Sequence, residues 1–156
     1  MNPIQWQWCD FAQLSNHDVY AMLALRSEVF VVEQQCIYHD IDGLDLAAWH
    51  LLGWQELQGR RSLVAYLRCL PAGVKFAELS LGRVISSAQV RGSGAGRALL
   101  SEGLRRMDAQ FPAQAIRIAA QQYLLNFYQQ FGFVACSAPF DEDGILHVDM
   151  LRQPAS

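Results

Sequence analysis

The feature that most constrains the fold is a run of alternating glycines between an apolar segment and an amphipathic one. Residues 81–86 form a candidate strand, and apolar side chains follow the glycines at helical spacing. At a helix start the first backbone N–H groups have no partner and the helix dipole is positive, so an anion is stabilised there. Glycines let a phosphate approach, and an arginine adds a forked cation. The segment therefore predicts a pyrophosphate site made by Arg91, Gly92, Ser93, Gly94, Ala95 and Gly96.

The residues after the glycines weigh against two other phosphate motifs. A P-loop ends in Gly-Lys-Ser/Thr, whereas Gly96 is followed by Arg97 and Ala98, so the lysine and the magnesium-binding hydroxyl are missing. A dinucleotide fingerprint has a glycine where Arg97 stands, and an acid about 20 residues later. ATP, GTP and dinucleotides are therefore disfavoured. The remaining alternative is a strand-to-helix turn whose glycines serve only the backbone.

Hydrophobic periodicity predicts alternating helices and strands in a single domain over residues 1–156. A capping box of Ser15 with Asp18 opens one helix, and Gly132 ends another. The acidic, aperiodic stretch from 33 to 49 is predicted to be a functional loop. The predicted strands cover 4–8, 50–56, 62–70, 81–86, 115–120 and 145–151, and the predicted helices cover 16–31, the segment burying Leu99, Leu100, Leu104 and Met107, and 123–131. We expect a mixed α/β fold in which helices cover a mixed sheet.

Charge and cysteine placement exclude several classes of protein. The net charge is −3 and no run of Lys and Arg exceeds a pair, so the basic surface of a nucleic-acid binder is missing. No apolar run approaches the roughly 18 residues of a membrane span, and we expect a cytoplasmic protein without a membrane partner. The cysteines are too far apart for a metal or redox motif. They are expected to be separate buried thiols, and Cys36 is the exception to watch because it lies in a polar loop.

Two motifs in the right order resemble the GNAT N-acetyltransferase superfamily. The pattern Arg91-x-x-Gly94-x-Gly96, after a strand that ends in Val84-Ile85-Ser86, resembles its acyl-CoA loop. The pattern Asn126-Phe127-Tyr128-x-x-x-Gly132-Phe133 resembles its second conserved block. The first third of the chain is similar to the ElaA-type branch through Val29-Phe30-Val31-Val32-Glu33-Gln34, Cys36, Tyr38, Asp40, Asp42-Gly43, Asp45 and His50-Leu51. The likeness spans nearly the whole chain.

The resemblance implies a GNAT-type acyl-CoA N-acyltransferase fold, with a mixed twisted sheet of about six to seven strands flanked by about four helices. Strands 81–86 and 115–120 would splay apart to admit pantetheine. It implies transfer of acetyl from acetyl-CoA to a primary amine of a small molecule or peptide, without a metal. By position, the backbone of Val84, Ile85 and Ser86 would hold pantetheine and polarise the thioester, residues 91–96 would hold the pyrophosphate, Asn126 would contact the CoA arm and Tyr128 would face the sulfur.

Direct transfer requires a neutral amine, an N–H donor for the developing oxyanion and an acid for the departing thiolate. Backbone N–H groups near Ile85 are the predicted donors. A phenol with a pKa of about 10 can protonate a thiolate whose thiol has a pKa of about 8.5, so Tyr128 is the predicted acid, with aromatic packing as the alternative. Three residues are candidates for the base, without a ranking: Glu33, His50 and His147.

Several alternatives remain open from the sequence. One group of carboxylates either attracts a cationic amine or is ordinary solvated loop charge: Asp40, Asp42, Asp45, Asp141, Glu142 and Asp143. A second functional hypothesis is a non-catalytic acyl-CoA-binding sensor, and a third is a nucleotide-binding α/β module. The chain is expected to be a monomer or a homodimer, and the acceptor amine is not identified.

Overall fold

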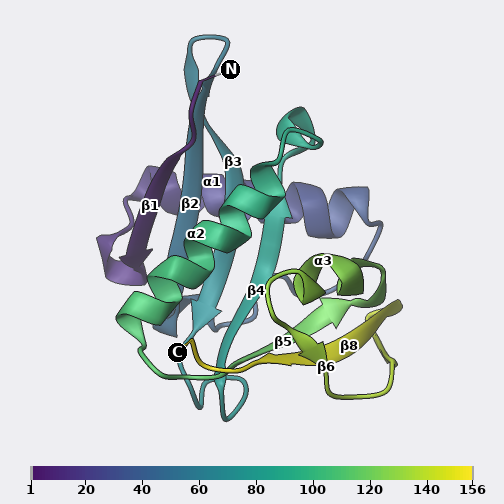
Figure 1. The fold of residues 1–156 in the computed structure, drawn as a ribbon. Helices are drawn as coiled ribbons and strands as arrows, with labels where there is room; N and C mark the ends of the chain where they lie inside the picture. The colour runs from purple at the N-terminus through teal and green to yellow at the C-terminus, as the bar shows by residue number, and fades with distance from the viewer. Residues whose placement is uncertain (1, 156) are drawn as a thin grey trace.

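One mixed sheet of eight strands runs through residues 2–155, the part of the chain that the computed structural model describes. The strand order is β1-β2-β3-β4-β5-β8-β6, and β7 pairs with β8 (Figure 1). The neighbours along β1 to β4 are antiparallel, β4 and β5 are parallel, and β8 is antiparallel to its partners. The strands are β1 Gln5–Asp10, β2 Trp49–Leu57, β3 Arg60–Leu70, β4 Leu79–Ser86, β5 Ile116–Gln121, β6 Val134–Ala135, β7 Phe140–Glu142 and β8 Ile145–Arg152. The expected mixed sheet is confirmed.

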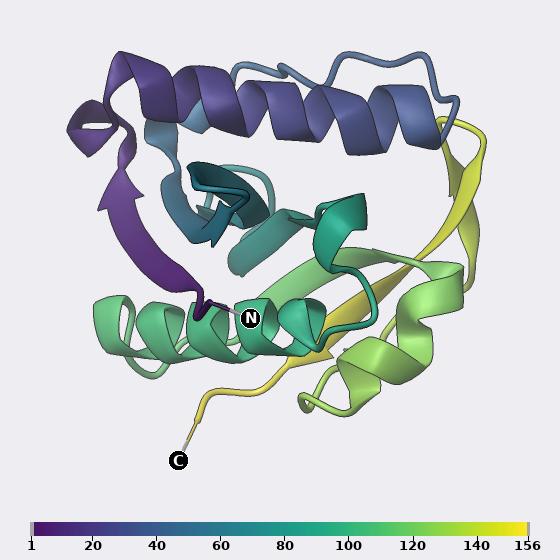
Figure 2. The ribbon, with the colours of Figure 1, turned by 90° about the horizontal axis from the view of Figure 1, so that it is seen from above.

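Helices cover both faces of the sheet. In Figure 2, α1 (Asn16–Arg26) lies over one face, while α2 (Ala95–Gln110) and α3 (Leu125–Gln129) lie on the other. The predicted capping box is present, because the Ser15 hydroxyl accepts the Asp18 N–H at 3.0 Å and the Asp18 carboxylate accepts the Ser15 N–H at 3.3 Å. This cap satisfies two backbone donors at the start of α1.

The predicted apolar face of α2 is buried against the sheet. Leu99, Leu100 and Met107 are fully buried, and Leu104 is 6% exposed. Each such side chain stabilises the fold by about 1.5–3 kcal/mol relative to exposure. Gly103 lets the helix approach β3 closely, since a Cβ there would lie 2.5 Å from Leu67 Cδ2. This packing fixes the start of α2, and with it the glycine loop, against the centre of the sheet.

The structure corrects the predicted number and length of elements. The sheet has eight strands rather than six to seven, and the described residues contain three α-helices rather than four. The predicted helix 16–31 stops being α-helical at Arg26 and continues as a π-helix, Ser27–Glu33, where Gln34 N–H bonds to the Val29 carbonyl five residues earlier. The predicted helix 123–131 is a 3₁₀ turn followed by the short α3. Strands β6 and β7 were missed because two or three residues carry no detectable period.

Candidate active site

A cleft of about 770 Å³ opens where β4 and β5 diverge. These parallel strands are paired only through Leu79 with Ile116 and Ser80 with Arg117, although both continue for several residues. The expected splay is therefore present. Backbone N–H and C=O groups that point into the gap beyond the last pair have no partner on the opposite strand. They are therefore available to form hydrogen bonds with a ligand in the gap. The side of the cleft formed by β4 includes Val84, Ile85 and Ser86.

A β-bulge in β4 shapes the cleft. Tyr66 pairs with Ile85 and Arg68 pairs with Gly82, so β4 carries one residue more than β3 between these pairs. Arg83 lies in this bulge with φ of 51°, a conformation that is uncommon for any residue but glycine. Bulges redirect a side chain next to active sites, and here Arg83 lines the cleft. Gly82 directly precedes Arg83, and a glycine inside a strand is a weak signal of a bulge that periodicity alone does not reveal.

The glycine loop has the geometry of an anion site. Gly92 and Gly94 adopt φ of 83° and 88°, which explains why these positions carry no side chain. The Ala98 N–H makes a helical bond to the Gly94 carbonyl at 3.1 Å, so the amides of residues 95–97 precede that bond at the start of α2. A Cβ on Gly96 would meet no atom within 4 Å. Of the six predicted loop residues, Arg91 and Gly96 line the cleft.

Arg91 is held by two partners on the protein. Its guanidinium pairs with the Glu33 carboxylate at 2.7 Å, and its Nε donates to the Ser86 carbonyl at 3.2 Å. Glu33, one of the three predicted bases, ends the π-helical segment and also lines the cleft. The structure therefore brings this candidate base together with the predicted pyrophosphate arginine.

Tyr128 lies at the cleft and Asn126 does not. Tyr128 is 5% exposed and packs edge-on against Phe127 and Phe133, so both of its predicted roles, packing and facing the cleft, are compatible with its position. Burial raises the pKa of Tyr128, with Tyr123 adding a smaller effect in the same direction, which keeps the phenol protonated at neutral pH. Asn126 is exposed and is not part of the cleft lining, so its predicted contact with the CoA arm has no support from the wall of the cleft.

His50 is a structural residue rather than a member of the site. It is fully buried, its Nδ1 lies 2.6 Å from the Tyr66 hydroxyl, and its Nε2 lies 3.0 Å from the Asp45 carbonyl. Burial lowers the pKa of His50 despite the nearby Asp45. Both ring nitrogens are engaged and the ring does not reach the cleft lining. The prediction of His50 as a base is therefore not supported by its position.

Three of the predicted acidic residues belong to a buried ion-pair network. Asp40 and Asp45 are buried, and with Asp42 they pair with three arginines at 2.7–3.3 Å. The pairs are Arg26 with Asp40 and Asp45, Arg68 with Asp42 and Asp45, and Arg83 with Asp40 and Asp42. Ordinary solvated loop charge is therefore wrong for Asp40 and Asp45, which are buried. Attraction of a cationic amine stays a prediction for Asp42, which is exposed and lines the cleft. Only Asp42, Arg68 and Arg83 of the network line the cleft.

Ion pairing controls the titration of this network. Burial alone would raise the pKa of Asp42, but hydrogen bonds from Arg68 and the Leu44 amide, with the charges of Arg68 and Arg83, lower it to about 2. The pKa of Asp45 is also lowered, because Arg26 and Arg68 more than offset its burial. Asp42 and Asp45 are therefore charged at neutral pH. Removing one partner from such a site leaves an uncompensated buried charge.

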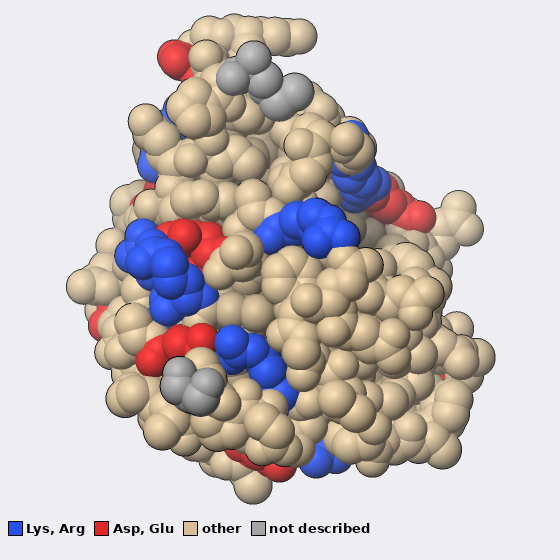
Figure 3. Space-filling view, in the orientation of Figure 1, with Lys and Arg blue, Asp and Glu red and all other residues tan. Residues whose placement is uncertain are grey.

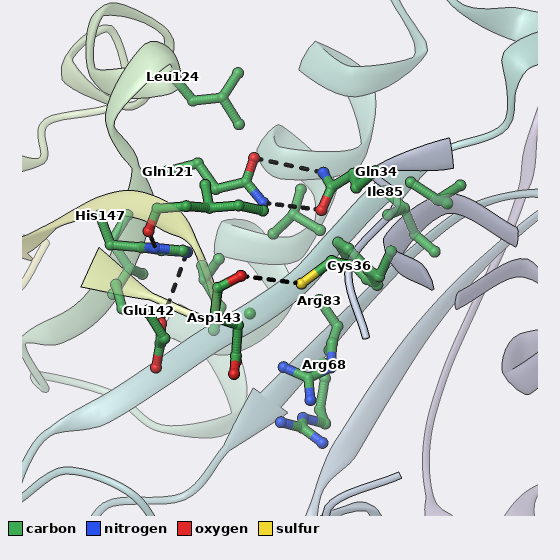
Figure 4. Close-up of a pocket in the computed structure, with 18 of the residues that line it drawn as sticks. Gln34, Cys36, Arg68, Arg83, Ile85, Gln121, Leu124, Glu142, Asp143 and His147 are labelled. Atoms are coloured by element: carbon green, nitrogen blue, oxygen red, sulfur yellow. Dashed lines mark hydrogen bonds and ion pairs between the residues drawn. The ribbon is translucent and has the colours of Figure 1, made fainter. Parts of the chain in front are cut away.

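Side chains from distant segments meet at the other end of the cleft. Gln34 and Gln121 exchange amide hydrogen bonds at 3.5 and 3.4 Å, and the Cys36 thiol donates to the Asp143 carbonyl at 3.2 Å (Figure 4). Cys36 is buried at the cleft rather than solvated in a polar loop. His147, the third predicted base, lines the same end. These contacts join segments far apart in the sequence, so periodicity gave no signal for them.

The surface carries no large field of one sign on the face in Figure 3. Lys and Arg form separate small groups there, several of them beside acidic side chains. No helix among residues 2–155 has the length and apolar character to cross a bilayer. Over the same residues, no group of three His, Cys, Asp or Glu side chains is arranged to bind a metal ion.

Comparison with known proteins identifies the family. Residues 72–153 match the family described as Acetyltransferase (GNAT) domain. The chain belongs to the GNAT acetyltransferase family. Within this family it is 41% identical to Protein ElaA of Escherichia coli over 96% of this chain and 97% of that protein, and 42% identical to a UPF0039 protein of Synechocystis over 95% and 94%. The resemblance to the ElaA-type branch is therefore confirmed.

Solved structures of GNAT-family proteins confirm the fold. The crystal structure of Escherichia coli ElaA superposes with a TM-score of 0.88 at 41% identity, covering 96% of this chain and 99% of that one. An acyl-CoA N-acyltransferase from Pseudomonas aeruginosa gives a TM-score of 0.88 at 37% identity with the same coverage. The mixed eight-stranded sheet with its splayed strands is thus the GNAT acyl-CoA N-acyltransferase fold, and the family uses acyl-CoA.

Proposed function

We propose that this GNAT-family chain is an N-acetyltransferase, which moves acetyl from acetyl-CoA to a primary amine of a small molecule or peptide by direct attack. The observation that carries the proposal is the splay of β4 from β5 next to an open anion site. Amides 95–97 and Arg91 would hold the pyrophosphate, and the thioester would then reach the gap between the strands. Chemistry by direct attack needs only a positioned thioester, an oxyanion donor and proton transfer.

The residues around the gap supply two of the three roles that the reaction needs. Backbone N–H groups of β4 near Ile85 can stabilise the oxyanion that develops on the thioester carbonyl, because no strand pairs with this edge beyond Ser80. Tyr128, protonated and buried at the cleft, can give its proton to the departing sulfur. Both groups are held by regular structure, which reduces the reorganisation needed at the moment of reaction.

A side chain placed at Gly96 tests the donor site. The position has an ordinary φ, and a Cβ there would touch no protein atom, so Gly96→Val should fold normally but occupy the space proposed for the pyrophosphate. We expect calorimetric titration of CoA to show binding to the wild type and at least a tenfold weaker affinity in the variant. Ala98→Val, at an exposed position of the same helix, is the matched control. Absence of heat from CoA binding to folded wild type would refute the proposal.

A thiol-release assay with acetyl-CoA and a panel of primary amines separates the enzyme from a non-catalytic sensor. An enzyme releases CoA thiol in proportion to one or more amines, whereas a sensor binds CoA and releases none. A thermal-shift comparison of CoA, ATP and NAD addresses the nucleotide-binding alternative, because a ligand that binds only the native state raises the melting temperature. Stabilisation by ATP or NAD without CoA would overturn the assignment.

A further inference from the structure

The hairpin formed by β7 and β8 places an imidazole and a carboxylate on one face beside the cleft. Asp143 and Gly144 both have positive φ, at 53° and 82°, which makes the tight two-residue turn that matches strand twist. The Asp141 carboxylate accepts the Gly144 N–H at 2.8 Å and stabilises this turn. Phe140 pairs with His147, and Glu142 pairs with Ile145. Alternation therefore puts these side chains on the same face, and three of them, Glu142, Ile145 and His147, line the cleft.

The contacts of His147 determine which ring nitrogen is free. Its Nδ1 lies 2.8 Å from the Ile145 carbonyl, which can only accept, so Nδ1 carries a proton and donates it. In the neutral ring the lone pair is then on Nε2. The Glu142 carboxylate lies 3.6 Å from Nε2, and its side chain is 44% exposed, compared with 11% for His147 (Figure 4). Phe140 stacks on the ring with a centroid separation of 6.0 Å and an interplanar angle of 26°.

This arrangement has the features of a base connected to water. The lone pair lies on a side chain that is 11% exposed at the cleft, and the carboxylate beside it belongs to a side chain that is 44% exposed. The other candidates lack one of these features: Glu33 is paired with Arg91, and His50 is buried away from the cleft. Imidazole is also the side chain that normally changes charge between about pH 5 and 8.

From this geometry we infer that His147 accepts the proton of the incoming ammonium on Nε2, with Glu142 as the positioning residue that stabilises the imidazolium and passes the proton to water. The inference rests on the proposed function and deepens it. It also implies an acceptor that enters beside β7 and β8 as a cation, a primary alkylammonium. A neutral or weakly basic amine would not need this pair.

With these groups, every proton and every bond made or broken in the reaction is accounted for. His147 takes one proton from the ammonium, and the freed nitrogen lone pair attacks the thioester carbon. The C–N bond forms, the C–S bond breaks, and Tyr128 gives its proton to the sulfur. The second proton lost by the nitrogen restores the Tyr128 phenol. The proton on His147 leaves through Glu142, so each turnover releases one amide, one CoA thiol and one proton.

The ionisable groups on the elements packed near His147 must be separated in any test of pH dependence. They are Glu142 on β7, Asp143 in the turn, Tyr123 after β5, Cys36 in the segment after the π-helix and Asp149 farther along β8. Among them Asp149 pairs with Arg117 at 2.8 Å. The pH profile should therefore be recorded for the wild type, for His147→Gln and for Glu142→Gln, so that the limb due to His147 is recognised by its loss in one variant alone.

The kinetic test compares two kinds of amine. With the most active primary alkylamine of the panel, we expect His147→Gln to lower kcat/KM about 100-fold and to remove the acid limb of its pH profile. With hydroxylamine, which is already neutral at pH 7, the loss should be much smaller. Glu142→Gln should lower kcat/KM about two- to fivefold with the alkylamine, and Glu142→Asp should recover part of it. His17→Gln, exposed in the first turn of α1, is the matched control.

Nitrogen NMR provides a readout that does not need an acceptor. In protein labelled with ¹⁵N at histidine, neutral His147 should show a protonated Nδ1 and an unprotonated Nε2, with the signals assigned by their loss in His147→Gln. The Nε2–H form would overturn the inference. So would a His147→Gln variant with the wild-type pH profile, or equal losses with alkylamine and hydroxylamine, while CoA binding and transfer persist. Failure of the wild type to bind CoA would instead overturn the proposed function, and this inference with it.

Discussion

One end of the cleft is formed mainly by backbone groups, and the other is formed mainly by side chains. The end that we propose for the acyl donor consists mainly of backbone: the amides at the start of α2, two glycines with positive φ and the unpaired edge of β4, with the Arg91 side chain beside them. The end that we propose for the acceptor consists of side chains from segments far apart in the sequence, among them Gln34, Gln121 and His147. The ion-pair network reaches the cleft through Asp42, Arg68 and Arg83, and the Cys36 thiol donates to the Asp143 carbonyl. A backbone site recognises what all acyl-CoA molecules share. A side-chain site can change its partner by substitution.

The two ends also differ in the free energy needed to form them. Backbone amides at a helix start are unpaired in any case, so the donor site requires only that glycine occupy the right positions. Ion pairs lose their hydration when they are buried, and only complete pairing offsets that loss. The acceptor end should therefore be the part of the molecule where a single substitution is most damaging to stability.

Breaking the network should give the largest effect. Arg26→Leu removes one of the two arginines that pair with each of Asp40 and Asp45, and both carboxylates stay buried with incomplete pairing, because Arg26 is fully buried and bonds to both. We expect the free energy of unfolding in urea to fall by about 3–5 kcal/mol. Where the variant remains folded at low temperature, its affinity for CoA should stay close to that of the wild type, because the donor end is made of separate elements.

Arg105→Leu is the control for that experiment. Arg105 pairs with Glu102 on the exposed face of α2, and the loss of such a surface pair should leave unfolding unchanged. Equal destabilisation by Arg26→Leu and Arg105→Leu would show that the buried network has no special weight. A loss of CoA affinity in folded Arg26→Leu would show that the two ends are not independent.

Removing the phenol of Tyr128 should affect turnover but not binding. Tyr128→Phe keeps the aromatic packing with Phe127 and Phe133 and deletes only the proposed acid. We expect kcat to fall about 100-fold, at the lower end of what acid–base catalysis contributes, because a water molecule can partly replace the phenol. The CoA dissociation constant should change less than twofold. Tyr20→Phe, at an exposed position of α1, serves as the control, and unchanged kcat in Tyr128→Phe would refute the acid.

The two ends also differ in how far they could be predicted from the sequence. The donor end follows from local rules, so the strand, the glycines and the apolar face of α2 were all predictable from neighbouring residues. The network was not, because Arg68 and Asp42 lie on different elements, and periodicity says nothing of which charges meet. The hairpin of β7 and β8 could have been predicted from the sequence, because Asp143-Gly144 is a strong signal for a two-residue turn. The pairing that follows from this turn places Glu142 and His147 on one face of the hairpin.

Acid should weaken the acceptor end before the donor end. The pKa of Asp42 is about 2 in the folded chain and 3.8 ordinarily. A depressed carboxyl pKa contributes stability that is present above pH 3.8 and is lost as pH falls through 2. Asp42→Asn should therefore cost roughly 1–2 kcal/mol at pH 7, and its difference from the wild type should shrink from pH 4 toward pH 2. Urea unfolding at several pH values measures this, and a difference independent of pH would contradict the assignment.

The smallest expected effect is a gain rather than a loss, and it concerns the ion pair between Arg91 and Glu33. Arg91 pairs with Glu33 at 2.7 Å, yet it is also the cation proposed for the pyrophosphate, so CoA must compete with the carboxylate. Glu33→Gln should strengthen CoA binding about two- to fivefold, as expected for loss of a partly exposed pair, and the gain should shrink as salt is added. Glu28→Gln, exposed on the same π-helical segment and outside the cleft, should leave affinity unchanged. Weaker CoA binding in Glu33→Gln would mean that the carboxylate holds Arg91 in place for the ligand, and a large loss of kcat would make Glu33, rather than His147, the base.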